Sequence, residues 1–327
     1  MRHLLRRIGF YIVAFWASIT FTFFLQHLAP GNPAQALMAR FQGRLRPEEL
    51  KALEIEFGVS THATLWQQYI QYMSQVLHGN LGNSFSQFPT PVSTVIAQQL
   101  PWTLGLAGVT VVISFVLGTF LGIVAAWRRS GALDSLMTPL FIFVSAIPYF
   151  WLALLLLYIL AYKLNWFPVA GGYDTNTYTV PVWTDPGFIL SVLRYALLPA
   201  ITIVVTSCAG WLLGMRNAMI TTLSEDYVLM AEAKGLPQRR VMMSYAARNA
   251  ILPSVTGFGM ALGFVVAGLV LTETVFSYPG IGYGLVQAVQ NSDYPLVSGI
   301  FMIIAFTVLA ANFIVDLLYG VLDPRVR

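Results

Sequence analysis

The chain has 327 residues, of which 57% are hydrophobic and only 10% are charged, and its formal net charge is +4. With 14 acidic side chains, the surface of a water-soluble protein of this length could not be covered, so the composition predicts an integral membrane protein and excludes a soluble domain. The basic excess requires no nucleic acid partner, because Lys and Arg in membrane proteins mostly set orientation. The single cysteine, Cys208, lies in an apolar run and cannot form an internal disulfide.

Six apolar segments are long enough to cross a bilayer, which takes about 20 residues. They lie at residues 8–28, 102–126, 136–162, 195–215, 251–272 and 298–320. The first begins like a signal peptide, but its apolar stretch is too long and no small-residue cleavage site follows, which predicts a retained span. Pro148 lies inside the third, which we interpret as one kinked helix rather than two shorter pieces. The predicted fold class is an all-α integral membrane protein with six transmembrane helices.

The distribution of basic residues predicts the orientation of these spans. If the N-terminus is cytoplasmic, two thirds of the 18 Lys and Arg residues fall on the cytoplasmic side, although the outside segments are longer. Basic residues concentrate in cytoplasmic loops of membrane proteins. Both termini are therefore expected in the cytoplasm, together with residues 226–248.

Residues 29–101, between the first two spans, have helical patterns of their own. Pro47 begins one pattern and Gly58 ends it, with Leu50, Leu53 and Phe57 on a shared face. A second face consists of Trp66, Tyr69, Ile70, Met73 and Leu77, with Gly79 as its stop, and a third short face consists of Val92, Val95 and Ile96. These patterns predict an extracytoplasmic helical cap that either packs over the membrane or also docks an external partner. The predicted domains are an N-terminal helix at 1–28, the cap at 29–101 and a five-helix membrane core at 102–327.

A polar stretch, "DYVLMAEAKGLPQRRVMMSYAARNAILP" at residues 226–253, interrupts the apolar core. Ser224 is expected to cap a helix with acidic residues in its first turn. Gly235 suits the left-handed position after a helix end, and Pro237 suits the first position of the next helix. The pattern predicts a cytoplasmic helix–turn–helix, which is either a solvated connector or a helix pair that docks into a groove of a partner. One face of its first helix is expected to consist of Tyr227, Met230, Ala231 and Lys234.

Several motifs in this chain resemble one transporter family. "AEAKGLP" followed by "RNAILP" is similar to the EAA-type coupling loop of bacterial ABC importer permeases, and the long spacing from Gly235 to Pro253 resembles the dipeptide/oligopeptide permease family. Further segments that resemble this family are "HLAPGNPAQAL" (27–37), "QQYIQYMSQVLHGNLGNSF" (67–85), "QQLPWTLGLA" (98–107), "LTETVFSYPGIGYGL" (271–285), "DYPLVSGI" (293–300) and "VDLLYGVLDPRVR" (315–327). The departures are Asn32 and Asn80, where the family often has Asp, and Leu229 and Glu232, where it often has basic residues.

The resemblance implies a permease subunit of an ATP-driven importer in a bacterial or archaeal cytoplasmic membrane. It implies a second homologous permease, two cytoplasmic ATPases and an external binding protein that delivers short peptides, with membrane lipid around the spans. The chain itself is expected to be no enzyme and to bind no cofactor, with ATP and Mg²⁺ on the ATPases, because no lysine follows a glycine as a phosphate-binding loop requires. The expected ATPase-coupling residues are Tyr227, Ala231, Glu232, Ala233, Lys234, Gly235, Leu236, Pro237 and Arg248.

Two carboxylates lie at the ends of apolar runs, Glu273 and Asp316. Ionisable groups there either serve transport or are interfacial carboxylates with a hydrogen-bonded partner. "SYPGIGYG" after the fifth span is expected to form a tight external loop, or one that dips back toward the path. The candidate residues of the path or its gate are therefore Glu273, Tyr278, Pro279, Gly280 and Asp316. Close helix packing or motion is expected at Gly257, Gly259, Gly263 and Gly268.

Other functions are less well supported by the sequence. The same architecture imports oligosaccharides, nickel chelates or other small solutes in relatives of the family. An intramembrane enzyme would need a nucleophile facing a base, and no histidine lies deep in a predicted span. A stand-alone carrier would usually have charged residues in mid-membrane or inverted internal repeats, and neither is seen in this sequence. The four histidines, His3, His27, His62 and His78, have no metal-ligand spacing, so no metal site is expected.

Overall fold

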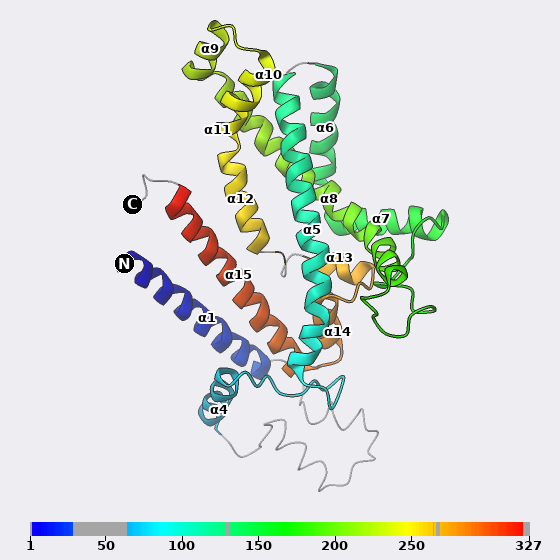
Figure 1. The fold of residues 1–327 in the computed structure, drawn as a ribbon. Coiled ribbons are helices and arrows are strands. Elements are labelled where there is room, and N and C mark those ends of the chain that lie inside the picture. Colours follow the sequence, from blue (N-terminus) through cyan, green and yellow to red (C-terminus); the bar gives the residue numbers. More distant parts are fainter. Residues whose placement is uncertain (1, 29–63, 129–130, 264, 266–268, 323–327) are drawn as a thin grey trace.

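The computed structural model describes residues 2–28, 64–128, 131–263, 265 and 269–322 (Figure 1). Across these residues the chain is helical and forms no β-strand; the one bridge of strand type joins Asn83 to Pro91. The described residues thus confirm the all-α fold class.

The helices follow one another from a long first helix to a long last one. They are α1 (Arg2–Leu28), α4 (Leu65–Leu77), α5 (Val92–Trp127), α6 (Ala132–Ala146), α7 (Tyr149–Leu156), η1 (Leu157–Lys163), α8 (Pro186–Leu223), α9 (Asp226–Ala233), α10 (Gln238–Arg240), η2 (Val241–Ala247), α11 (Arg248–Ala250), α12 (Leu252–Gly263), α13 (Val270–Val275), α14 (Ile281–Gln290) and α15 (Tyr294–Leu322). Figure 1 places α9 and α10 at one end of the molecule and α4 at the other. Segments η1 and η2 are π-helical.

The long helices α5 and α8 form the centre of the fold, where they pack against each other along much of their length. Two glycines allow this close approach. A Cβ atom on Gly118 would lie 2.5 Å from the Cβ of Trp211, and one on Gly122 would lie 2.6 Å from the carbonyl oxygen of Leu212. Small residues serve this purpose in membrane helices, which lack a hydrophobic driving force for association. The sequence analysis expected this role at four later glycines; of these, Gly259 meets a side chain at 2.9 Å, that of Val315.

The third predicted span is broken, not kinked. Its two parts, Asp134–Ala146 and Tyr149–Lys163, are bent by 97° relative to each other. Pro148 precedes α7 and ends the helical ladder of α6 rather than bending it. In Figure 1 α7 runs across the direction of α5 and α6. The expected single helix over 136–162 is therefore wrong, and a corner stands in its place.

The described residues contain four helices long and apolar enough to cross a membrane, or five with the bent pair. Helix α12 covers 12 residues, about 18 Å, which is short for an apolar layer about 30 Å thick. The helical segments α10, η2 and α11 lengthen it at its start. Residues 264 and 266–268, in the predicted fifth span, lie outside the described part, so the count of six spans stays a prediction.

The predicted cap is described from residue 64 onward. Helix α4 confirms that the second predicted pattern is helical, although Trp66, Ile70 and Leu77 of its predicted face are exposed and Tyr69 is buried. Thr64 and Gln67 form a reciprocal capping box, and Gly79 follows with a φ of +73°. The third face is different, because Val92, Val95 and Ile96 form the first turns of α5 rather than a separate helix. The helix expected from Pro47 to Gly58 lies outside the described residues. Asn80 accepts a 3.0 Å hydrogen bond from the Gly82 backbone, so it keeps an acceptor that an aspartate would offer.

Candidate functional site

The polar stretch forms two short helices joined by a tight turn at one end of the molecule (Figure 1). Gly235 has a φ of +71°, as its sequence context predicts. Its N–H donates to the Glu232 carbonyl at 2.8 Å, and the N–H of Leu236 donates to the Ala231 carbonyl at 3.4 Å. These two bonds form a Schellman motif, which ends α9 at a fixed angle.

Two details of the predicted helix pair are wrong by a few residues. Ser224 does not cap α9; it ends α8, and its hydroxyl donates to the Thr221 carbonyl. Glu225 stands at the cap of α9 without a side-chain hydrogen bond. Pro237 likewise precedes α10 rather than beginning it. Helix α8 is continuous over 38 residues and extends beyond the predicted apolar span. Ser224, which was expected to cap the next helix, therefore lies at the C-terminal end of α8.

The first helix of the pair, α9, has a buried face and an exposed face. Val228 and Ala231 are buried against Met215 and Met219 of α8 and against Val241 of η2. Tyr227, Leu229 and Met230 are 38%, 51% and 58% exposed. Ala231 therefore lies in the interior of the chain, although it was expected on one face with Tyr227, Met230 and Lys234 and among the ATPase-coupling residues. Overpacking at Ala231 would disrupt this chain before it touched any partner.

The other expected coupling residues lie at the surface. The exposed ones are Glu232, Ala233, Lys234, Gly235, Pro237 and Arg248, whereas Leu236 is half-buried. Within the described residues, neither Glu232 nor Lys234 forms an ion pair. The turn thus presents apolar and unpaired charged groups side by side, which is the composition of a surface that a protein partner can cover.

The expected gate residues from Glu273 to Gly280 come together, but in the interior rather than on an open path. Glu273 has no exposed surface. One carboxylate oxygen accepts from the Thr103 hydroxyl at 2.7 Å, and the other accepts from the backbone N–H groups of Gly282 at 2.7 Å and Tyr283 at 3.1 Å. Thr103 in turn accepts from the N–H of Ile281 at 2.8 Å. The carboxylate thereby caps α14 and fixes it to α5 and α13.

The residues between Glu273 and α14 complete this buried junction. Tyr278 is 3% exposed, and its ring meets Trp102 edge-on at 5.7 Å. A side chain on Gly280 would collide with the carboxylate of Glu273. The segment "GIGYG" was expected to continue an external loop, but Ile281 begins α14 instead. Of the two readings of Glu273, this geometry favours the hydrogen-bonded structural carboxylate.

Asp316 lies apart from this junction, where α1 packs on α15. Its carboxylate accepts from the Tyr11 hydroxyl at 2.8 Å, and its carbonyl accepts from Arg7 at 2.8 Å. Tyr11 also packs edge-on against Phe313. These contacts make Asp316 an anchor for the first part of α1, whose other end contacts α4, where Thr20 and Tyr69 share a 2.8 Å hydrogen bond.

Comparison with known proteins adds to this geometry. Residues 118–327 match the family described as the binding-protein-dependent transport system inner membrane component, and residues 1–107 match the N-terminal family of the same transport systems. The dipeptide transport system permease protein DppB of Escherichia coli strain K12 is 34% identical over 340 residues, which cover 100% of this chain and 99% of that protein. The chain belongs to this permease family.

Two further relatives agree along their full lengths. The di/tripeptide transport system permease protein DppB of Pseudomonas aeruginosa strain UCBPP-PA14 is 34% identical, over 98% of this chain and 97% of that protein. The dipeptide transport system permease protein DppB of Lactococcus lactis strain MG1363 is 31% identical, over 100% and 99%. The resemblance to ABC peptide-importer permeases is thus confirmed. The permease is a multi-pass inner-membrane protein and a transporter subunit, not an enzyme.

Two polar contacts that the sequence did not predict fix elements of the permease. Asp134 of α6 forms a bidentate ion pair with Arg216 of α8, with N–O distances of 2.7 and 2.9 Å. Asp293 has no exposed surface and accepts from both the N–H and the hydroxyl of Ser86 and from the N–H of Leu296. Acidic residues beside long apolar runs were the available signal, because such groups need a partner there.

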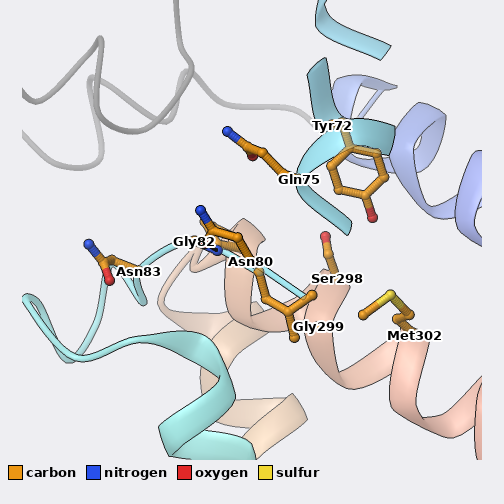
Figure 2. A pocket seen from close by; sticks show the side chains of 10 residues that line it. Tyr72, Gln75, Asn80, Gly82, Asn83, Ser298, Gly299 and Met302 are labelled. Carbon is orange, nitrogen blue, oxygen red and sulfur yellow. Dashed lines mark hydrogen bonds between the residues drawn. The ribbon is translucent and has the colours of Figure 1, made fainter. Parts of the chain in front are cut away.

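The permease has a polar cavity of about 310 Å³ at the end that carries α4. Figure 2 shows Tyr72 and Gln75 of α4 on one side and Ser298, Gly299 and Met302 of α15 on another. Asn80, Gly82 and Asn83 of the segment between α4 and α5 complete the labelled lining. Burial raises the pKa of Tyr72 to about 12, so its hydroxyl stays neutral near pH 7. Among the described residues, the lining offers amide and hydroxyl groups and no charged side chain.

Proposed function

We propose that this permease forms half of the translocation path of an ATP-driven importer for short peptides. Two relatives that match it over nearly their full lengths are named as dipeptide permeases, and a third as a di/tripeptide permease. The exposed face of α9 beside its Schellman turn carries the proposal on the chain itself. The sequence has no phosphate-binding loop, so energy from ATP has to enter through contact, and this face is suited to receive it.

The partners follow from this role. A second, homologous permease completes the path, and two cytoplasmic ATPases bind ATP and Mg²⁺ and dock at α9. An external binding protein delivers the peptide at the opposite end, where α4 and the polar cavity of Figure 2 lie.

Uptake by the reconstituted complex tests the proposed function. The permease is placed in proteoliposomes with its partner permease, its ATPases and its binding protein. Labelled dipeptide should enter only when ATP is supplied on the side of the membrane where the ATPases lie. Uptake should also require the binding protein. Uptake of a labelled oligosaccharide or nickel chelate in place of peptide would keep the importer role and replace the substrate.

The orientation gives a first prediction, that both termini and residues 226–248 face the cytoplasm. The start of α1 and the end of α15 lie away from α4, toward the end of the molecule that carries α9 (Figure 1). This arrangement supports the orientation that the distribution of basic residues predicts. Single cysteines at Ser60 and Gln238 should therefore react differently with a membrane-impermeant thiol reagent in intact cells. Position 60 should be labelled and position 238 only after lysis. The reverse pattern would contradict the orientation.

A second prediction concerns the coupling face. Met230→Asp puts a charge on the apolar surface of α9 that the ATPase would have to bury, which costs several kcal/mol if the charge stays unpaired. We expect ATPase subunits to be lost during purification, while the permease itself accumulates normally because Met230 is 58% exposed. Gly235→Val should act in the same direction, since a β-branched residue at positive φ is strained by roughly 1–2 kcal/mol.

The matched control is Gln238→Glu, which adds the same charge at an exposed position beyond the turn. Retained ATPase and the hydrolysis stimulated by substrate-loaded binding protein are the two measurements. Wild-type values for both Met230→Asp and Gly235→Val would make the stretch a connector only.

A further inference from the structure

A cavity of about 390 Å³ lies at the corner where α6 ends and α7 begins. Its polar groups are the hydroxyls of Ser145, Thr206, Ser207 and Thr272, which come from α6, α8 and α13, and of Tyr149 at the start of α7. Ile203 and Leu269 are among its apolar walls. None of its lining residues in the described part of the chain is charged. The cavity can therefore form hydrogen bonds with a ligand, and its lining does not favour a ligand with a charged side chain.

Among the hydroxyls of the cavity, those of Ser145 and Thr206 have a partner within the chain, and that of Thr272, which is fully buried, has none. Ser145 donates to the Ile142 carbonyl at 2.7 Å, and Thr206 donates to the Thr202 carbonyl at 2.9 Å. Both keep lone pairs that can accept a further hydrogen bond. Thr272 has no exposed surface, and its hydroxyl oxygen makes no hydrogen bond. A buried hydroxyl without a partner is unfavourable, so its presence at a cavity points to a ligand.

The broken helix adds fixed partial charges to the same place. Helix α6 ends at Ala146, where its last carbonyl groups lack partners in the helix and carry partial negative charge. Helix α7 begins at Tyr149, and the N–H groups of Tyr149 and Phe150 have no backbone acceptor. Opposite helix ends thus meet at one corner. Discontinuous helices in membrane carriers bind anionic groups at such N-termini and cations at such C-terminal ends.

We propose that this corner is a substrate station on the translocation path, which holds a short zwitterionic peptide by its main chain. The peptide carboxylate binds at the start of α7 and its ammonium group at the end of α6, and Thr272 and Ser207 hydrogen-bond the peptide group between them. This inference rests on the proposed function. The uncharged lining contacts the peptide group and the two charged termini, which all short peptides have. The station therefore accepts peptides that differ in their side chains.

The variant Thr272→Val tests the station, because it removes the hydroxyl and keeps the shape of the side chain. Loss of one substrate hydrogen bond should lower dipeptide uptake by about threefold to tenfold in the reconstituted complex. The amount of folded permease should not fall, since the hydroxyl has no partner in the chain to lose. ATP hydrolysis stimulated by the loaded binding protein should persist, because the coupling face is unchanged.

The chain offers a matched control in Thr119→Val. The hydroxyl of Thr119 on α5 is also buried and without a hydrogen-bond partner, but Thr119 does not line the cavity. Uptake by this variant should equal wild type. Equal uptake by both variants and wild type would overturn the station and leave the proposed importer intact. Failure of the wild-type complex to take up any dipeptide would instead overturn the proposed function.

A second measurement asks what occupies the cavity. Ser145 is exposed, so Ser145→Cys, in a Cys208→Ala background, should react with a cationic methanethiosulfonate in the assembled complex. Dipeptide, together with binding protein and a nonhydrolysable ATP analogue, should slow that reaction, whereas a free sugar should not. A cysteine that never reacts would show that the second permease fills the corner, and a reaction that dipeptide leaves unchanged would exclude peptide from it. Either result would overturn the proposal.

Discussion

Glu273→Ala is expected to reduce the amount of folded permease in the membrane to a small fraction of wild type. The carboxylate accepts hydrogen bonds from Thr103, Gly282 and Tyr283 at a place with no exposed surface. Removing it leaves these donors without an acceptor, and hydrogen bonds to charged groups contribute about 1.5–3 kcal/mol each. The expected loss of stability is of the order of several kcal/mol, which is a large share of the total free energy of unfolding of a typical protein.

A graded series makes this prediction specific. Glu273→Gln keeps one oxygen that can accept from Gly282 and Tyr283, so its loss of yield and of melting temperature in detergent should be smaller than that of alanine. Thr103→Val should resemble Glu273→Ala in direction, because it removes the hydroxyl that links Glu273 to Ile281. Glu225→Gln is the control, since that exposed carboxyl makes no side-chain cap bond. Normal yield with lost transport in Glu273→Ala would place the carboxylate on the path after all.

Gly122→Leu is expected to prevent correct packing of the two central helices. A Cβ atom at this position would already lie 2.6 Å from the Leu212 carbonyl oxygen and 2.9 Å from the Cβ of Met215, both on α8. The backbone of α8 cannot change its position as a flexible side chain can change its rotamer. The two helices α5 and α8 would therefore have to separate along their interface. Overpacking costs about 1–3 kcal/mol even where side chains can adjust, and more is expected here.

The control for this substitution lies on the same helix. A Cβ atom on Gly108 would meet nothing within 4 Å, so Gly108→Leu changes helix composition equally without a collision. Folded yield and thermal stability of the purified chain are the measurements, with Gly122→Ala expected between the two leucine variants. Equal stability of Gly122→Leu and Gly108→Leu would mean that α5 and α8 do not pack as closely as described.

Local signals were sufficient for much of the fold and for the helix ends in the polar stretch at 226–253. Apolar runs predicted long helices, Gly235 predicted a left-handed turn, and Gly79 predicted the end of α4; the φ values of +71° and +73° confirm both glycine positions. These features depend on interactions between residues close in sequence, such as the Schellman bonds around Gly235. The same locality limited the interpretation of Pro148, because a proline weakens a helix whether the chain then bends slightly or turns a corner.

The remaining features depend on residues far apart in sequence. Thr103 and Glu273 are 170 positions apart, and no pattern in either segment predicts that the two residues form a hydrogen bond. Ala231 shows the same limit, since helical periodicity gave a face but only α8 and η2 decide that it is buried. The sequence by itself thus determined the membrane class, the long helices, the turn at Gly235 and the permease family. The tertiary structure alone decided that Glu273 fixes α14, that Gly118 and Gly122 bring α5 to α8, and that the third span turns a corner around a hydroxyl-lined cavity, because each requires distant segments to meet.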